Sequence, residues 1–282
     1  MLVTLLAASL VGAAGAQQTD TVFAVPANVR VAVHGIGGEV TVRTWSRNQL
    51  QVELDDEDVG RIEISRTDSR VLIDPAWRHG AHFGADLTIT VPTGASIEIE
   101  GAMTDVEIDG VQGEIAVSTA QGSIEVRGGT RFIRLHTMQG EVTLSDAVGR
   151  MDLHSVNGEI DVRDVEGELT AATVNGDITL EGVTSDAVEA GTTNGDIEYE
   201  GTLSARGRYT FGTHGGDVTL VVPATTSATV SVSSFSGGVE SDFPLTLRGT
   251  ESGGKRFTFT LGAGEGRIEV GSFSGTVYLR RP

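Results

Sequence analysis

The stretch MDLHSVNGEIDVRDVEGELTAATVNGDITL, from Met151 to Leu180, repeats itself with an 18-residue period, since VNGEIDV is followed by VNGDITL. Weaker copies lie half-way between, as in VQGEIAV at 111–117 and VEGELTA at 165–171. The repeat unit is therefore about nine residues long, and two units make one repeat. The glycines that mark the repeat recur at intervals of 18 and then of 19, 21 and 21: Gly122, Gly140, Gly158, Gly176, Gly195, Gly216 and Gly237.

Each unit has an apolar–x–apolar centre, and this alternation is typical of a β-strand because successive side chains point to opposite faces. We find no window with the apolar stripe of an amphipathic helix, so the pattern predicts an all-β chain. The pairs are Ile97/Ile99, Val106/Ile108, Ile115/Val117, Ile124/Val126, Ile133/Leu135, Val142/Leu144, Met151/Leu153, Ile160/Val162, Leu169/Ala171 and Ile178/Leu180. A third apolar residue often follows three positions later and is expected to close the turn over the core: Val111, Met138, Val156, Val165, Val174 and Val183.

A constant 18-residue repeat favours a solenoid, in which equivalent positions stack directly on one another. A propeller blade needs about 40 residues, and a left-handed hexapeptide helix needs an apolar residue at about every sixth position. Glu166 breaks the hexapeptide pattern. We therefore predict a single-domain parallel β-solenoid (β-helix) with about 18 residues per turn and two main strands, and the general crossover preference predicts a right-handed coil.

Stacking predicts columns in which like side chains of successive rungs lie about 4.8 Å apart. The column of carboxylates is expected to be solvated, and the glycines are expected to supply positive φ at the turn. The hydroxyl column is Thr119, Thr137, Ser155, Thr173, Thr192, Thr213, Ser234 and Ser272. The amide column, in which each side chain can bond to its neighbour, is Gln121, Gln139, Asn157, Asn175 and Asn194. The acidic column is Glu141, Glu159, Asp177, Asp196 and Asp217.

The composition excludes several classes of function. The 282 residues contain 38 Gly and no Cys and carry a formal charge of −19. The lack of Cys excludes disulfides, thiolate metal sites, Cys nucleophiles and a lipidated N-terminal Cys. The strong negative charge repels nucleic acid and anionic membranes, so we expect no nucleic-acid partner.

The N-terminus predicts export. Residues 1–16, MLVTLLAASLVGAAGA, are apolar with a small-x-small end at Ala14-Gly15-Ala16, which fits a signal peptide, although no Lys or Arg precedes the apolar run. The run is too short for a transmembrane span, and no second one follows. We expect a mature chain from Gln17 without a membrane span, in the periplasm, at the cell surface or outside the cell.

Longer motifs at both ends of the chain resemble the bacterial DUF4097 family, whose members are named as adhesin candidates. They are FAVPANVRVAVHGIGGEVTVRTW (Phe23–Trp45), LTITVPTGASIEIE (Leu87–Glu100), GGDVTLVVPATTSATVSVSSFSGGVESDFPLT (Gly215–Thr246) and GAGEGRIEVGSFSGTVYL (Gly262–Leu279). The resemblance covers essentially the whole mature chain. It implies a β-solenoid in exported or envelope proteins, with no established enzymatic activity and no catalytic residues.

We expect one adhesin-like solenoid domain over 17–282, after the signal peptide at 1–16. Residues 20–95 are predicted to cap the N-terminal end, 96–222 to form the regular rungs, and 223–282 to form C-terminal rungs and a cap. The irregular loop 74–86 and an excursion at 242–256 interrupt the pattern.

Few residues suggest ligand chemistry. His136 and His154 are 18 apart, so they should be stacked neighbours able to share Zn²⁺ or Cu²⁺, but no third His continues the column. The turns lack the register of calcium-binding nonapeptide rolls, which leaves only weak surface Ca²⁺ binding open. We assign no metal ligands, no cofactor and no catalytic residues. The candidate partner-contact residues are Trp77, His79, His82 and Phe83, since aromatic and His residues on a loop are typical of recognition.

The resemblance implies a non-enzymatic adhesin or surface-binding module for a polymeric or envelope partner, such as a glycan. Two alternatives stay open. One is a structural or sensory envelope protein that binds another protein. The other is a carbohydrate-active enzyme, which the stacked carboxylates would suit but the short loops would not. A flat Thr array for ice binding would need two adjacent Thr columns, and the sequence has one.

Overall fold

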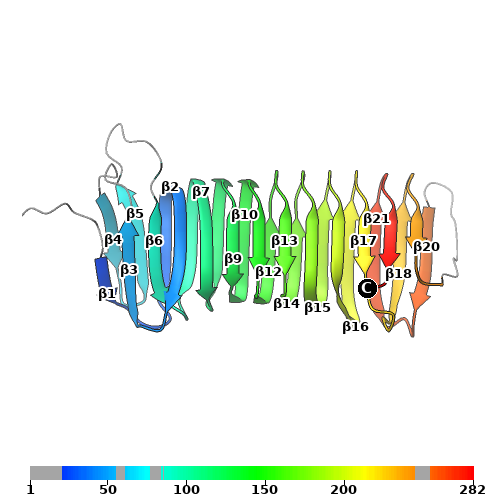
Figure 1. Cartoon of the computed structure of the whole chain (residues 1–282), viewed down its shortest axis with the longest axis horizontal. Coiled ribbons are helices and arrows are strands. Elements are labelled where there is room, and N and C mark those ends of the chain that lie inside the picture. Colours follow the sequence, from blue (N-terminus) through cyan, green and yellow to red (C-terminus); the bar gives the residue numbers. More distant parts are fainter. Residues whose placement is uncertain (1–20, 55–60, 77–83, 85, 245–254) are drawn as a thin grey trace, which may run out of the picture.

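The computed structural model describes residues 21–54, 61–76, 84, 86–244 and 255–282, and within them every regular element is a β-strand. The strands lie side by side along the longest axis of the molecule (Figure 1). They are β1 (Thr21–Ala24), β2 (Arg30–Trp45), β3 (Gln49–Leu54), β4 (Arg61–Arg66), β5 (Arg70–Ala76), β6 (Leu87–Pro92), β7 (Ser96–Val111), β8 (Ile115–Gln121), β9 (Ile124–Gly128), β10 (Thr130–Gln139), β11 (Val142–Ser145), β12 (Val148–His154), β13 (Ile160–Arg163), β14 (Glu166–Ala172), β15 (Ile178–Thr192), β16 (Ile197–Thr213), β17 (Val218–Val221), β18 (Ala228–Ser234), β19 (Val239–Ser241), β20 (Lys255–Leu261), β21 (Gly266–Ser272) and β22 (Val277–Arg280).

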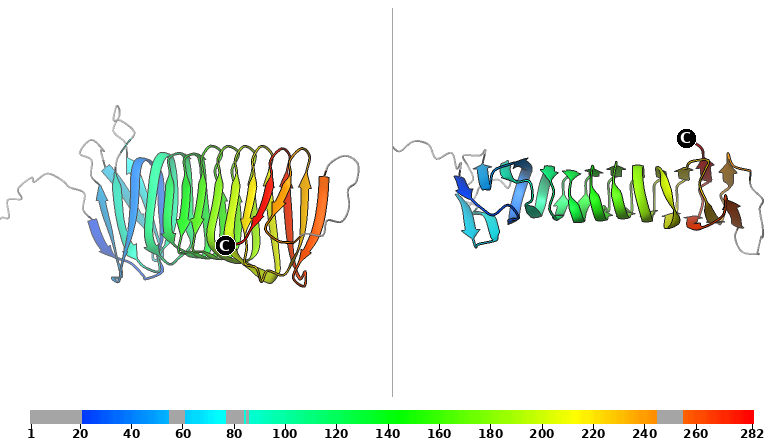
Figure 2. Two further views of the ribbon diagram at one scale, coloured as in Figure 1. Left: turned by 45° about the vertical axis from the view of Figure 1, so that its right-hand side comes forward. Right: turned by 90° about the horizontal axis from the view of Figure 1, so that it is seen from below.

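The central strands form a coil in which each turn pairs with the next in parallel. On the first face β8, β10, β12 and β14 are successive neighbours, and on the second face β9, β11 and β13 are. Ile133 pairs with Ile115 on one side and Met151 on the other, so the register advances by one repeat period per turn. The predicted all-β parallel solenoid is confirmed, and Figure 2 shows its two faces from below and its stacked turns in the tilted view.

The core lies between the two faces. Leu153 from the first face and Ile160 and Val162 from the second are fully buried, while the residues that alternate with them along each strand point outward. Complete burial of one such aliphatic side chain stabilises the fold by about 1.5–3 kcal/mol. Because the same positions are apolar in every rung, the core is continuous along the solenoid.

The hydroxyl column is buried in the turn that leads from the first face to the second. Thr173 Oγ1 donates to the carbonyl oxygen of Gly158, 15 residues earlier, at 3.0 Å. The same bond recurs in the neighbouring rungs from Thr137, Ser155, Thr192, Thr213 and Ser272. The column therefore ties each turn to the preceding one and forms no exposed Thr array of the kind that ice binding would need.

The turn glycines are required mainly for lack of space, which corrects the expectation that positive φ explains them. Gly122 and Gly140 do have positive φ, at 131° and 150°. At Gly158 and Gly176, however, the constraint is the preceding rung, since a Cβ there would collide with the backbone carbonyl of Gly140 or Gly158 respectively. Each of these glycines thus leaves room for the carbonyl that accepts the hydroxyl bond.

The amide ladder is confirmed over most of its length. Asn175 Nδ2 donates to Asn157 Oδ1 at 2.7 Å, and Asn194 Nδ2 donates to Asn175 Oδ1 at 2.8 Å. Gln121 bonds to Gln139 in the same way at 3.2 Å. At the step between, Asn157 Nδ2 turns to the carbonyl oxygen of Met138 at 3.5 Å, so the shift from Gln to Asn interrupts the ladder.

The acidic column is more than a solvated face. Asp177 Oδ1 accepts a hydrogen bond from the Asp196 backbone N–H at 2.8 Å, and Asp196 Oδ1 accepts one from the Asp217 N–H at 2.8 Å. Asp217 repeats the contact with Thr276. A carboxylate that accepts a backbone N–H contributes a charge-assisted bond, which offsets the repulsion within the column.

At both ends the order of the rungs in space differs from their order in the chain. The β2 rung lies between the β5–β6 rung and β7. At the other end β21 and β22 are inserted between β16–β17 and β18–β19. The hydroxyl column therefore does not follow chain order at this end, because Ser272 lies between Thr213 and Ser234.

Antiparallel strands cover the outer rungs. β4 pairs with β5, β3 pairs with β6, β1 pairs with β3, and β20 pairs with β18. A parallel solenoid otherwise ends in unpaired backbone groups that could template association with another chain.

The described residues contain no helix of the length and apolarity that crossing a membrane requires.

Candidate functional site

A shallow groove of about 590 Å³ lies on the first face beside the hydroxyl turn. Its sides include the outward-facing His136 and His154 and the residues Met138, Val156 and Val174 that follow the buried hydroxyls. Because equivalent residues stack from rung to rung, the groove follows the solenoid axis. Titratable and exposed apolar side chains meet in this groove.

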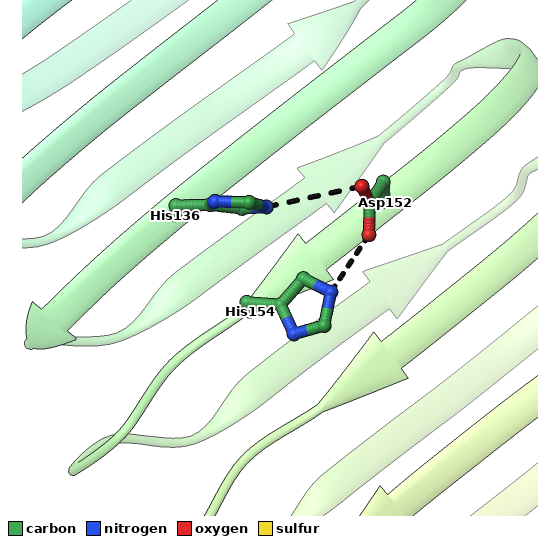
Figure 3. A group of neighbouring side chains, drawn as sticks. All are labelled: His136, Asp152 and His154. Atoms are coloured by element: carbon green, nitrogen blue, oxygen red, sulfur yellow. Dashed lines mark hydrogen bonds and ion pairs between the residues drawn. The ribbon is translucent and has the colours of Figure 1, made fainter.

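His136 and His154 are register partners on β10 and β12, as their spacing predicts. The ring centroids lie 4.8 Å apart with an interplanar angle of 85°. Asp152 is two residues before His154 and therefore points to the same side of the sheet. Figure 3 shows its carboxylate between the two rings. His154 Nε2 donates to Asp152 Oδ1 at 2.7 Å, and His136 Nε2 lies 3.9 Å from Asp152 Oδ2.

The environment of His136 disfavours its protonation. Burial, followed by the neighbouring His154, lowers the pKa of His136 below its usual range, and Arg134 acts in the same direction while Asp152 opposes it. Nε2 of His136 is itself buried and has no hydrogen-bond partner among the described residues. The ring therefore presents a neutral nitrogen that is desolvated and unpaired.

Arg134 competes for the carboxylate of this cluster. Its Nε lies 3.6 Å from Asp152 Oδ2, and its guanidinium lies 4.8 Å from the centroid of the Phe132 ring. Arg134 is the register partner of Asp152, so this charge sits on the adjacent strand. The cluster is thus two imidazoles and one carboxylate with a single cation beside it in the described structure.

The same three register positions hold a second group of possible ligands, His34, Glu98 and Glu100. His34 pairs with Glu100 as His136 pairs with His154, and Glu98 precedes Glu100 as Asp152 precedes His154. His34 Nε2 is also buried without a described partner. An Arg again lies beside the carboxylate, with Arg70 3.5 Å from Glu98.

An exposed apolar ridge borders the groove. We define the ridge as the residues that directly follow the buried hydroxyls. In rung order they are Ala120, Met138, Val156, Val174, Thr193, His214, Phe273 and Phe235. The polar Thr193 and His214 separate its aliphatic part from its aromatic part. Met138 is 59% exposed and Phe235 is 60% exposed. At the C-terminal end the rings stack in rung order, with centroids 4.5 Å apart for His214 and Phe273 and 4.9 Å apart for Phe273 and Phe235.

Sequence reasoning brought His136 and His154 together but missed Asp152. The two-residue strand period could have found Asp152.

The expectation that Met138, Val156 and Val174 close the turn over the core is wrong, since the structure exposes them. The hydroxyl column places His214, Phe235 and Phe273 in one line, so the sequence offered a signal for the ring stack, but only the inserted rung puts Phe273 in its middle. The predicted contact residues Trp77, His79, His82 and Phe83 lie outside the described residues, as does the expected signal peptide at 1–16.

Comparison with known proteins gives a family match. The family described as Toastrack DUF4097 matches residues 27–280. No curated protein matches the sequence.

Several solved structures are similar over most of the chain at low identity. One, a "putative adhesin" from Bacteroides fragilis, has 15% identity and a TM-score of 0.47, and the match covers 94% of this chain and 98% of that one. Another, a "putative adhesin" from Parabacteroides distasonis, has 12% identity, coverage of 93% and 97%, and a TM-score of 0.45. A "putative cell adhesion protein" from Clostridium sporogenes has 10% identity, coverage of 94% and 100%, and a TM-score of 0.24.

Proposed function

The chain belongs to the Toastrack DUF4097 family, and from this premise we propose that it is an exported, non-enzymatic module that binds an extended partner, a polymer or an envelope component. The binding surface is the ridge together with the groove beside it. The observation that carries the proposal is the in-register exposure of apolar side chains along one edge of a rigid solenoid.

The exposure along the ridge is unusual for a surface that contacts only water. Large apolar side chains that form a contiguous exposed strip are typical of interaction sites, whereas scattered ones are not. Met138, Val156 and Val174 occupy successive rungs and are 59%, 38% and 41% exposed. A ligand that is itself extended or repetitive can use the same contact in each rung.

In the rungs of β14, β15, β16 and β21 the floor of the groove carries no side chain larger than a methyl group at the position of the histidines. The outward position that holds His136 and His154 becomes Ala172, Gly191, Gly212 and Gly271 in later rungs. At Gly212 a Cβ would meet no described atom within 4 Å. Glycine inside a strand weakens it, so a glycine without a steric reason suits close approach of a ligand.

The charge of the molecule narrows the class of partner. A formal charge of −19 disfavours polyanions and anionic lipid surfaces. Neutral glycans, cationic polymers and protein surfaces remain compatible with it.

The direct test is binding of the exported chain to a glycan array and to envelope fractions of the host. A Phe235→Ser/Phe273→Ser double variant should lose saturable binding by at least about ten-fold if the ridge is the contact. Val148→Ser is the matched control. Val148 is 49% exposed, but it is the first residue of β12 and does not belong to the ridge. Equal binding by wild type and the double variant would reject the ridge as the binding surface.

One observation favours a protein partner as the second candidate, in a structural or sensory role. The rings of Phe235 and Phe273 stack nearly parallel, with an interplanar angle of 3°, and His214 stacks on Phe273, so the aromatic part of the ridge is a preformed exposed surface. Aromatic and Met side chains are enriched in the centre of protein interfaces. Protease treatment of the envelope fraction would abolish binding for a protein partner and leave it unchanged for a glycan.

A further inference from the structure

We propose that His136, Asp152 and His154 form a binding site for a divalent transition metal ion, with Zn²⁺ as the expected ion. This inference concerns the cluster itself and does not depend on the nature of the partner proposed above. It replaces the expectation from sequence that the chain has no metal ligands, because the structure adds a third donor to the two histidines.

The donor set is one that Zn²⁺ prefers. Imidazole nitrogens and a carboxylate oxygen suit Zn²⁺ and other borderline ions, whereas Ca²⁺ and Mg²⁺ require several oxygen ligands. The three ligand atoms all lie within 4.8 Å of one another. Two imidazoles in the set therefore select against the hard cations that an acidic surface would otherwise attract.

The geometry is close to what coordination needs. Bonds of about 2.1 Å with tetrahedral angles place ligand atoms about 3.4 Å apart. The separations of 2.7 Å from His154 Nε2 to Asp152 Oδ1 and 3.9 Å from His136 Nε2 to Asp152 Oδ2 lie on either side of that value. The side chains are 28–43% exposed, so small rotations about χ1 and χ2 can adjust them while the strands stay fixed.

The buried ring nitrogen of His136 favours a metal bond. This Nε2 lacks a partner among the described residues, which costs free energy that a metal bond would recover. Metal binding would cost the hydrogen bond from His154 to Asp152 and would weaken the ion pair of Arg134 with the same carboxylate.

The recurrence of the arrangement in His34, Glu98 and Glu100 supplies an internal comparison. This second group has one imidazole in place of two. Arg70 also lies against its Glu98, at 3.5 Å. We therefore expect the His136 cluster to bind Zn²⁺ more tightly, and His34 serves as a control of the same residue type at the equivalent register position.

Three protein ligands leave a fourth position for water or an outside donor, as in zinc sites that bind further ligands. His136 and His154 both border the groove. A metal ion held by them would add one coordinate contact for a ligand in the groove, beside the apolar contacts of the ridge.

The test is titration of the tag-free, chelator-treated full-length mature chain with ZnCl₂. Isothermal calorimetry would give affinity and stoichiometry, and two-dimensional NMR of the imidazoles would identify the ligands. We expect one preferred equivalent of Zn²⁺, with shifts of His136 and His154 but not of His214. His136→Ala, His154→Ala and Asp152→Asn should each weaken that equivalent at least about ten-fold, while His34→Ala, His214→Ala and a His79→Ala/His82→Ala double variant should retain it.

Either of two results with ZnCl₂ would overturn the proposal. One is unchanged Zn²⁺ affinity in a His136→Ala/His154→Ala double variant whose melting temperature matches wild type. The other is the absence of saturable binding by the wild type up to millimolar ZnCl₂. CaCl₂ is the probe for the alternative that the site binds a hard cation. The assignment would also be rejected if Ca²⁺ shifted the same two imidazoles in preference to Zn²⁺.

Discussion

Thr173 Oγ1 donates a hydrogen bond to the carbonyl oxygen of Gly158 in the preceding rung, at 3.0 Å. That carbonyl occupies the space that a side chain at Gly176 would need. One backbone group therefore explains two positions of the Thr-x-Asn-Gly-Asp repeat. The Asn joins the amide ladder, and the Asp accepts the next backbone N–H, so every polar position of the turn has a structural role.

Gly176→Ala should be severely destabilising, by about 3 kcal/mol or more, because its Cβ would collide with backbone rather than with a mobile side chain. Gly212→Ala is the matched control. Its Cβ would meet no described atom within 4 Å, so we expect a change within about 1 kcal/mol and of stabilising sign. Urea denaturation of both variants checks this, and similar midpoints for the two would contradict the steric explanation.

Thr173→Val should reduce the free energy of unfolding by about 1–2 kcal/mol. The substitution keeps the shape of the side chain but leaves the Gly158 carbonyl without its buried donor. Thr170→Val, at a half-buried outward position on β14, should change the value by less than about 0.5 kcal/mol. The comparison requires thermal or urea unfolding at one pH, and a neutral Thr173→Val would show that the hydroxyl column is dispensable.

Asp177→Ala should cost about 1 kcal/mol, more than a solvated carboxylate would, because Asp177 Oδ1 accepts the Asp196 N–H. Glu159 occupies the same column one rung earlier, and no such bond from its side chain is present in the described structure. Glu159→Ala is therefore expected to be nearly neutral. Equal unfolding midpoints for the two variants would show that the acidic column is solvated and does not stabilise the fold.

Arg134→Gln should tighten Zn²⁺ binding several-fold, because it removes the cation that lies 3.6 Å from Asp152 Oδ2. Arg150→Gln is the control, since Arg150 pairs with the exposed Glu168. Calorimetric titration of both variants measures the effect. Weaker binding by Arg134→Gln would mean that Arg134 positions the carboxylate for the metal instead of competing for it.

The lowered pKa of His136 predicts a pH dependence of stability. Burial and then His154 and Arg134 disfavour the charged ring, and Asp152 only partly compensates. The unfolded chain therefore binds the proton more readily, so this contribution to stability is present above about pH 6.5 and is lost as the pH falls below it. His136→Gln should melt with a smaller decrease between pH 7.5 and 5.5 than wild type, without added metal. Parallel decreases for both proteins would place the titrating group elsewhere.

The sequence was sufficient for the regular part of the fold. The 18-residue period specifies which residues stack, so it pairs His136 with His154, and Asn157 with Asn175, without further information. The alternation of apolar residues specifies which side chains are buried. Both signals are local and repeated, and repetition makes them easy to read.

The candidate site was predicted only in part. The histidine pair follows from the period, and Asp152 follows from the two-residue strand repeat once the outward side of the strand is known. The unpaired state of His136 Nε2 and the distance of Arg134 from the carboxylate depend on rotamers and packing. No pattern of residue types specifies those.

Rung composition, strand register and the inward or outward direction of each side chain were thus determined by the sequence alone. Only the tertiary structure decided the order of rungs at the two ends, where β2 and the β21–β22 rung are inserted between neighbours distant in the chain. That insertion places Phe273 between His214 and Phe235 in the ring stack. The physical reason is that every rung presents the same ladder of backbone groups and the same apolar positions. A rung can therefore pair with many other rungs, and the packing and capping of the ends select one order.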